Sequence, residues 1–351
     1  MRDLLKLTAE LVDIPSVSFE EGPLVSMIEK ELSAVPHLSI DRVGDNLVAR
    51  TNLNKGQRLV LAGHTDTVPG DTESGARIEK DTCWGLGTAD MKGGIAVMLE
   101  LARSVTEYEI DATWVFYARE EVAREHNGLK EIFTEAPELL SGDAAVLGEP
   151  TSALIEAGCQ GTMRFLLTFK GERAHSARPW MGRNAVHRLS GVLDALEKYE
   201  HREPLIDGCQ FREALQAVGV DGGVAGNVIP DMATLLINHR HAPDRNSEEA
   251  ESHVREFLMP YMEDEDSVEL IDMAPAASPG MGHSLLASIG EGIETRAKLG
   301  WTDVAFFSEQ GIPAINFGPG DATLAHTAEE RVERENLEVT FETLRRVLEG
   351  N

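Results

Sequence analysis

Short apolar runs alternate with amphipathic helical patterns through the first part of the chain and again near its end. The strand-like runs cover residues 58–64, 112–120, 144–149 and 313–320, and the helical patterns cover residues 22–34, 92–104 and 334–349. Strands that alternate with helices form a mostly parallel sheet with helices on both faces. The sequence therefore predicts an α/β domain built around such a sheet.

The middle of the chain has a different pattern, in which strands follow one another more closely. Strand-like runs cover residues 162–171, 231–243 and 267–275, and helical patterns cover residues 184–199 and 246–258. This order predicts a small α+β domain with a four-stranded antiparallel sheet. We expect this domain to span residues 159–278 and to be inserted between two parts of the α/β domain, 1–158 and 279–351.

Histidines and acidic residues stand where apolar runs stop or in short turn-like phrases such as GLGTADMKGG and AHTAEE. The set is His64, Asp90, Glu120, Glu121, Glu149 and His326. In an α/β sheet, ligands gather beyond the carboxyl ends of the strands. We therefore expect these side chains to share one site at that edge.

The residue types in this set suit a pair of zinc ions. Zinc accepts imidazole nitrogen and carboxylate oxygen at about 2.0–2.2 Å, and two zinc ions about 3.5–4 Å apart can share one carboxylate. Three carboxylates and two imidazoles can hold the pair, which leaves a fourth carboxylate free to act as a base. The set thus predicts a two-zinc hydrolytic centre.

Two details of this set bear on the roles of its members. Glu120 and Glu121 are adjacent at a strand end, so their side chains point in different directions, and one can bind metal while the other faces the substrate. Spacing alone does not say which. Asp66 follows His64 by two residues and is well placed to orient that imidazole.

Charge and composition exclude several classes of function. The net charge of −28 argues against nucleic acid as a partner, because a polyanion would be repelled. It leaves room for a small anionic substrate, since charges are screened over about 10 Å.

We expect no membrane span, because no apolar run approaches about 20 residues. Three cysteines without a CxxC pair, and an amino-terminal stretch unlike a signal peptide, predict a cytoplasmic protein.

Several phrases along the chain resemble those of a known enzyme family. They are GHTDTVP, GTADMKGG, REE, GEP and AHTAEE, in this order, with AHSARP and GNVIPD in the middle of the chain. They resemble the di-zinc metallopeptidase family of aminoacylases, acetylornithine deacetylase, glutamate carboxypeptidase and succinyl-diaminopimelate desuccinylase. The resemblance covers nearly the whole chain and implies a di-zinc exopeptidase-like catalytic domain with an inserted dimerisation domain.

The resemblance also implies a role for each residue of the set. Two Zn²⁺ ions per subunit are expected, and Co²⁺ is expected to be able to replace them. Asp90 would bridge the ions, with His64 and Glu149 completing one site and Glu121 and His326 the other. Glu120 would be the general base, and Asp66 would orient His64. The peptide bond between Asp90 and Met91 would be cis.

Further residues are implied to contact the substrate. The inserted domain of the family forms a homodimer through a sheet edge, and His175 would reach the active site of the other subunit and stabilise the oxyanion. Arg178, Asn227, Arg240 and Gly318 would contact the substrate. Alternation along the strand places His239 and His241 on the face opposite Arg240, which predicts a structural or solvated role for both histidines.

Phrases in the inserted domain resemble the actinobacterial branch of the desuccinylases in this family. They are GCQGTMRF, AHSARPWMGRNAVH, IDGCQFREAL and VDGGVAGNVIPDMATLLINHRHAPDR. The expected reaction removes succinate from N-succinyl-L,L-diaminopimelate, on the route to lysine and cell-wall precursors. This N-acyl amino acid is anionic at both ends, so arginines such as Arg178 and Arg240 would suit its carboxylates.

Two alternatives stay open from the sequence. The chain could be an acetylornithine deacetylase or a related aminoacylase or dipeptidase on the same scaffold. It could also be a catalytically silent protein that holds metal. Substrate assays separate the first alternative from the expected activity, and a turnover assay with added zinc separates the second.

Overall fold

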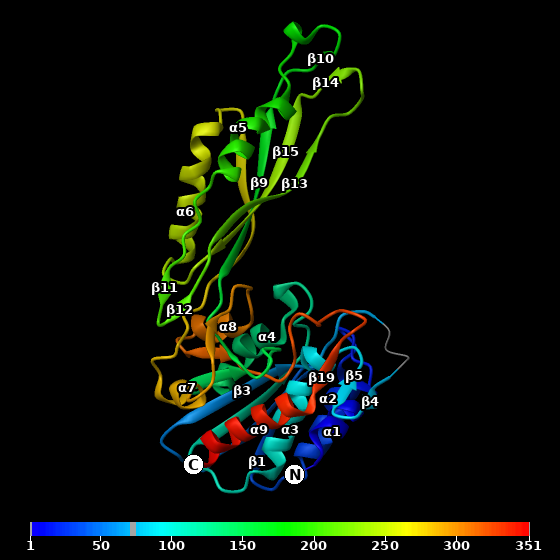
Figure 1. Ribbon diagram of the computed structural model, residues 1–351, viewed down its shortest axis with the longest axis vertical. Coiled ribbons are helices and arrows are strands. Elements are labelled where there is room, and N and C mark those ends of the chain that lie inside the picture. The colour runs from blue at the N-terminus through cyan, green and yellow to red at the C-terminus, as the bar shows by residue number, and fades with distance from the viewer. Residues whose placement is uncertain (1, 71–74, 351) are drawn as a thin grey trace. The chain divides into compact units, whose positions relative to one another are not determined.

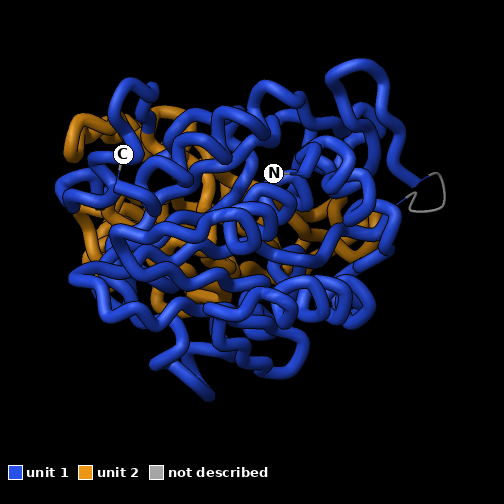
Figure 2. Tube along the Cα trace, turned by 90° about the horizontal axis from the view of Figure 1, so that it is seen from below, with its two compact units in different colours: residues 1–158, 279–296, 306–351 blue, residues 159–278, 297–305 orange. Residues whose placement is uncertain are grey.

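The computed structural model describes residues 2–70 and 75–350. The chain divides into two compact units, which Figure 2 draws in blue and orange. Unit 1 comprises Met1–Gly158, Pro279–Arg296 and Phe306–Asn351, and unit 2 comprises Cys159–Ser278 and Ala297–Ala305. Unit 2 therefore takes in a short second segment besides the insertion expected from the sequence.

Unit 1 is built around a mixed sheet in the order β1-β2-β6-β3-β7-β18-β8-β17. The strands are β1 (Leu38–Val43), β2 (Asn46–Thr51), β3 (Arg58–His64), β6 (Asp111–Tyr117), β7 (Ala144–Leu147), β8 (Ile155–Ala157), β17 (Thr295–Ala297) and β18 (Ala314–Asn316). The central strands β6, β3, β7 and β18 are parallel, whereas β2 joins β6 and β8 joins β18 in antiparallel fashion. The predicted α/β sheet is confirmed, and its parallel part lies at the centre.

Helices cover this sheet, and a small second sheet lies beside it. The helices are α1 (Leu4–Val12), α2 (Gly22–Leu32), α3 (Gly93–Ser104), α4 (Gly128–Glu135), α7 (Ser284–Ile289), α8 (Val304–Glu309) and α9 (Arg334–Glu349), with short turns at Thr88–Lys92, Arg124–His126 and Pro137–Leu140. The second sheet joins β4 (Arg77–Glu79), β5 (Thr82–Trp84) and β19 (Arg331–Glu333) in the order β19-β5-β4. Helices α1, α3 and α9 lie side by side (Figure 1).

Helix α3 is placed by a close approach of backbone to backbone. A Cβ atom on Gly94 would lie 2.4 Å from the carbonyl oxygen of Gly148, just after β7. Only glycine allows this distance without displacing one of the two segments. The first turn of α3 is thereby held against the end of β7, which brings the residues before α3 to the carboxyl edge of the sheet.

Unit 2 contains the predicted four-stranded antiparallel sheet, in the order β13-β15-β9-β16. The strands are β9 (Gly161–Lys170), β13 (Ala214–Gly222), β15 (Met232–His241) and β16 (Ser267–Ala274), and the helices are α5 (Ala185–Glu197) and α6 (Ser247–Leu258). Short pairs join β10 (Ala174–His175) with β14 (Val228–Ile229) and β11 (Leu205–Ile206) with β12 (Cys209–Gln210), and short turns cover Pro179–Met181 and Met259–Tyr261.

The core of unit 2 follows from alternation along its strands. On β15, Ala233, Leu235 and Ile237 are buried and pack with residues of α5 and α6, while the residues between them are partly exposed. Such alternation is typical of a sheet with one face covered by helices. His239 and His241 continue the buried row, as predicted, and Arg240 lies on the other face.

Two expectations from composition can be compared with this structure. The three cysteines are buried and form no disulfide, which agrees with reduced thiols. None of the helices in the described ranges combines the length and the apolar character needed to cross a membrane.

His239 makes unit 2 sensitive to acid. Its Nδ1 donates to the carbonyl oxygen of Ala214 at 3.0 Å, and its buried Nε2 has no hydrogen-bond partner among the described residues. Burial lowers the pKa of His239 to about 4, and the neighbouring His241, His253 and Arg245 act in the same direction. A proton on Nε2 would be buried without an acceptor.

We therefore expect unit 2 to lose stability as the pH falls from about 6.5, where the unfolded histidine takes up its proton, towards 4. Burial also lowers the pKa values of His241 and His253, so part of the dependence comes from them and should remain when His239 is replaced. The folded pKa lies below the unfolded one, so the unfolding free energy falls in this window by up to about 1.4 kcal/mol per pH unit. The effect is measured by urea titrations at pH 7 and pH 5, in which hydrogen exchange of unit 2 peptides reports the unfolding of this unit. His239→Asn keeps a donor near Nδ1 and should flatten the dependence, and an equal pH dependence in both proteins would contradict this account.

Candidate metal centre

The centre is assembled where the central parallel strands end. His64 is the last residue of β3, and it pairs in register with Tyr117, the last residue of β6. Glu120 and Glu121 follow three and four residues after Tyr117. Because β3 and β6 are parallel neighbours, their carboxyl ends coincide and bring the histidine beside the two glutamates.

Asp90 reaches the same place from the turn before α3. Its backbone and that of Met91 are not helical, and the peptide bond between them is cis, as the resemblance implied. The amides of Ala89 and Asp90 donate to Oε1 of the buried Glu330 at 3.0 and 3.1 Å. Glu330 therefore fixes the backbone from which the Asp90 side chain extends.

Two imidazoles face the two oxygens of Asp90. His64 Nε2 lies 3.0 Å from Asp90 Oδ1, and His326 Nε2 lies 3.5 Å from Asp90 Oδ2. His326 Nε2 also lies 2.7 Å from Glu121 Oε1. One ligand atom each from His64, Asp90 and Glu121 falls within 4.8 Å of the others. This donor set can hold a metal ion.

Opposite charges hold these groups together. Burial acts to lower the pKa of His64, but Asp66 and Asp90 outweigh it and hold that pKa well above its usual value. Asp90, followed by Glu121, raises the pKa of His326 to about 9. Burial raises the pKa of Glu121. Carboxylates that surround two imidazoles and raise their pKa values indicate a site whose electrostatic environment favours a positive charge.

Asp66 ties the two strand ends together. Its carboxylate accepts from the amides of Glu120 (3.0 Å to Oδ1) and Glu121 (3.1 Å to Oδ2), and from the hydroxyl of Ser18 (2.8 Å). His64 Nδ1 lies 3.0 Å from the Asp66 carbonyl oxygen and 3.5 Å from its Oδ1. Asp66 thus contacts the imidazole through its backbone as well as its side chain, and the carboxylate mainly holds the glutamates.

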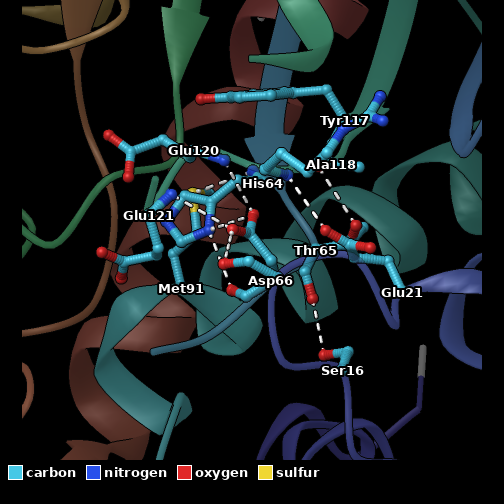
Figure 3. A network of polar contacts seen from close by, with 12 residues as sticks. Ser16, Glu21, His64, Thr65, Asp66, Met91, Tyr117, Ala118, Glu120 and Glu121 are labelled. Carbon is cyan, nitrogen blue, oxygen red and sulfur yellow. Dashed lines mark hydrogen bonds and ion pairs between the residues drawn. The ribbon is translucent and has the colours of Figure 1, made fainter. Parts of the chain in front are cut away.

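The two glutamates leave the turn in different directions. In Figure 3 the carboxylate of Glu120 lies above that of Glu121, and the ring of His64 lies beside both. Glu121 is the one in contact with His326. This geometry supports Glu121 as the ligand and leaves Glu120 for another role, and both assignments stay predictions.

Comparison with known proteins identifies the family. The peptidase family M20/M25/M40 matches residues 60–350. The chain belongs to this family. The protein named putative succinyl-diaminopimelate desuccinylase DapE from Mycobacterium tuberculosis is 48% identical over 351 residues, which cover 99% of this chain and 98% of the relative. The succinyl-diaminopimelate desuccinylase of Corynebacterium glutamicum is 44% identical over 340 residues, 94% of this chain and 91% of the relative.

Solved structures share the fold of the family at low sequence identity. A tripeptidase from Staphylococcus aureus has a TM-score of 0.77 at 20% identity and covers 99% of this chain and 97% of its own. A dinuclear metal-binding peptidase of the M20 family from Bacillus subtilis has a TM-score of 0.72 at 17% identity, with 98% and 96% covered. The resemblance drawn from the sequence is confirmed at the level of family and fold.

Glu149 and Gly318 lie next to each other in this M20 fold. Glu149 is buried two residues after the end of β7, the strand beside β3. A Cβ atom on Gly318 would lie 2.2 Å from the carbonyl oxygen of Gly148 and 2.4 Å from that of Glu149. Gly318 is therefore needed for close packing behind Glu149, and the roles of Glu149 as ligand and Gly318 as substrate contact stay predictions.

The other predicted substrate contacts belong to unit 2. His175, on β10, pairs with Val228 on β14, and the amide of Ser176 donates to the carbonyl oxygen of Asn227 at 2.9 Å. The amide of Arg178 donates to the carbonyl oxygen of His175 at 2.8 Å. His175, Arg178 and Asn227 are thus grouped in one tip of unit 2, whereas Arg240 lies on β15 between its pairing partners in β9 and β13.

A cavity of about 530 Å³ opens beside His326 in unit 1. Its walls include Pro69, Trp84 and Leu86, and Arg77 contributes a positive charge. This volume falls in the usual range for small-molecule sites. It lies beside His326, one of the predicted metal ligands.

The sequence patterns did not point to Glu330 or Ser18. Glu330 stands in AHTAEE, where an acidic pair so late in an acidic chain reads as solvated, and only its burial reveals its contact with the Asp90 turn. Ser18 is separated from Asp66 by 48 residues. No local spacing could have joined Ser18 to the centre, and the nearness of Glu330 to His326 in sequence does not reveal its contact with the Asp90 turn.

Proposed function

We propose that this protein is a zinc-dependent amide hydrolase that removes succinate from N-succinyl-L,L-diaminopimelate and yields L,L-diaminopimelate. The observation that carries the proposal is identity of 48% and 44% to two actinobacterial proteins named for this activity, over nearly the full length of both. The arrangement of His64, Asp90, Glu121 and His326 supports it, because a hydrolase of this kind needs such a donor set.

We assign two Zn²⁺ ions to each subunit, with Co²⁺ as an acceptable replacement. Imidazole nitrogen and carboxylate oxygen are donors that zinc accepts well. His64 and Glu149 would hold one ion, Glu121 and His326 the other, and Asp90 would bridge them. Three carboxylates remove three of the four positive charges, which leaves the centre attractive to the carbonyl oxygen of a substrate.

Glu120 carries the proton in the proposed reaction. Bound ions would polarise the amide carbonyl and lower the pKa of a nearby water molecule. The Glu120 carboxylate takes a proton from that water, the water oxygen adds to the carbonyl carbon, and the carbon–nitrogen bond breaks as Glu120 passes the proton to the leaving nitrogen. Asp66 keeps the Glu120 backbone in place through its amide.

Unit 2 would supply recognition of the substrate. His175, contributed by the second subunit, would stabilise the oxyanion that forms on the carbonyl. Arg178 and Arg240 would bind the carboxylates of the substrate through charge-assisted hydrogen bonds, and Asn227 and Gly318 would complete its contacts. Buried, unpaired cysteines suit a reducing compartment, so we place the enzyme in the cytoplasm.

Steady-state kinetics on the zinc-loaded protein tests the activity. We expect kcat/KM for N-succinyl-L,L-diaminopimelate to exceed that for N-acetylornithine by at least about 100-fold, because a site built for a charged acyl group leaves its arginines unpaired when that group is missing. The reverse preference would identify an acetylornithine deacetylase. Absence of turnover on either substrate, with zinc bound, would favour a silent metal-binding protein.

Glu120→Gln separates the base from the ligands. The amide cannot take up a proton, so we expect kcat to fall by about 10²–10⁴-fold while the zinc content stays at that of the wild type. Glu125→Gln, at an exposed position in the same segment, is the matched control and should leave both unchanged. Zinc content and kcat are measured on the same samples. Loss of zinc in Glu120→Gln would show that this residue is a ligand and not the base.

We further propose that unit 2 forms a homodimer through the edge strand β13. The two edges of its sheet are β13 and β16. β13 exposes Val218 and Val220 by 55% and 57% and carries one exposed acidic residue, Asp221. β16 exposes Ile271 and Met273 less, by 48% and 41%, and carries two exposed acidic residues, Glu269 and Asp272, and charges on an edge strand oppose pairing. An edge with exposed valines is the better candidate for pairing with a second copy.

Val220→Lys tests this assignment. The added charge would have to be buried at the dimer contact, so we expect the variant to be a monomer by light scattering coupled to size-exclusion chromatography. Ile271→Lys on the opposite edge strand is the control and should remain dimeric. A dimeric Val220→Lys protein together with a monomeric Ile271→Lys protein would show that the dimer forms through β16 and not through β13.

A further inference from the structure

A second buried carboxylate lies close to the turn that carries the general base. Glu21 is fully buried and is none of the predicted metal ligands. Its Oε1 accepts hydrogen bonds from the amides of Phe19 at 3.0 Å and Arg119 at 3.1 Å. A buried carboxyl group loses its hydration, so its contacts to backbone amides have to compensate for that loss.

The helix that follows does not explain this residue. Glu21 directly precedes α2, where a side chain commonly caps the free amides of the first turn. Its side chain makes no such hydrogen bond. Instead it reaches a peptide 98 residues further along the chain, next to the predicted general base.

The amide that Glu21 binds belongs to a residue in an uncommon conformation. Arg119 has φ +62°, in the left-handed region that side chains other than glycine rarely adopt. Phe19, whose amide binds the same oxygen, has φ +76°. Such conformations persist where surrounding contacts determine them, and here one carboxylate oxygen is a contact common to both.

Three successive amides of the catalytic turn are therefore held by two buried carboxylates. Glu21 binds the amide of Arg119, and Asp66 binds those of Glu120 and Glu121. In Figure 3 Glu21 lies next to Ala118, on the side of the turn away from the carboxylates of Glu120 and Glu121. The backbone around the predicted general base, Glu120, is therefore held by hydrogen bonds from two directions.

We propose that Glu21 is a positioning residue for catalysis, which fixes the Arg119 peptide and so the direction in which the Glu120 carboxylate points. This inference rests on the proposed function of Glu120. Displacement of a catalytic group by about 1 Å can cost about 100-fold in rate, so a grip on the preceding peptide has a measurable effect. Glu21 contacts neither substrate nor metal in this role.

The chemistry of the contact sets the design of the variants. An amide oxygen can accept the same two hydrogen bonds, so Glu21→Gln retains the grip. Leucine has a similar volume and no acceptor, so Glu21→Leu removes both hydrogen bonds without leaving a large cavity. Burial raises the pKa of Glu21, and the neutral acid also accepts through its carbonyl oxygen, so the contact does not depend on the charge. Glu20→Leu, at the exposed neighbouring position, is the matched control.

The experiment measures kcat, KM and zinc content on N-succinyl-L,L-diaminopimelate, and hydrogen exchange of peptides that span residues 118–122. For Glu21→Leu we expect kcat to fall by about 10–100-fold with KM within about twofold, full zinc content and faster exchange in that segment. Glu21→Gln should stay within about threefold of the wild type in kcat and match its exchange. Glu20→Leu should match the wild type throughout.

Several outcomes would overturn the inference. Wild-type kcat and exchange in a folded Glu21→Leu protein would show that the contact is unimportant. Equal loss in Glu21→Gln would show that the charge matters rather than the acceptor, and zinc loss in proportion to activity would make Glu21 a support of the metal site. If Glu21→Leu does not fold, Glu21→Asp withdraws the oxygen by one methylene and takes its place. If the wild-type protein has no activity, the proposed function is contradicted. The role of Glu21 in holding the Arg119 peptide is still tested, because the comparison of hydrogen exchange does not need activity.

Discussion

The carboxylate of Asp66 is the contact on which the centre depends. Asp66 leaves β3 two residues after His64 and binds the amides of Glu120 and Glu121, which follow β6. Parallel strands bring their ends to one edge, but loops beyond the strands are free to diverge. A buried carboxylate that accepts from two successive amides locks one loop to the other, so histidine and glutamates keep a fixed separation.

Five acidic residues at or near the centre differ in what their carboxylates contact. Asp66, Glu330 and Glu21 are buried and accept hydrogen bonds from backbone amides. Asp90 and Glu121 remain partly open and face the two imidazoles. Carboxylates bonded to backbone cannot turn toward an ion, whereas those facing imidazoles can exchange that contact for a metal. The carboxylates bonded to the backbone thus help to position Asp90 and Glu121, the predicted ligands.

The sequence predicted the parts of this arrangement that have a local pattern. The runs that became β3, β6 and β7 were recognisable because each is largely apolar and is closed by a polar residue, His64, Glu120 or Glu149. Strand β13 was missed as a run, since its glycines and exposed positions interrupt alternation and a bulge shifts its register at Gly219. Glu330 and Glu21 were missed for another reason: each acts on a backbone amide far away in the sequence, and such a contact leaves no pattern of side chains.

The metal centre cannot by itself select the substrate. Structures named for tripeptide and dinuclear peptidase functions share the fold at 20% identity or less, and one fold serves many substrates. The difference between a succinyl group and a peptide must therefore be recognised by residues outside the ligand set. Those residues have to be positive, since the proposed substrate is anionic while the chain carries a net charge of −28. Arg178 and Arg240 of unit 2, which we propose as carboxylate contacts, are where a change of charge should alter specificity before it alters the chemistry.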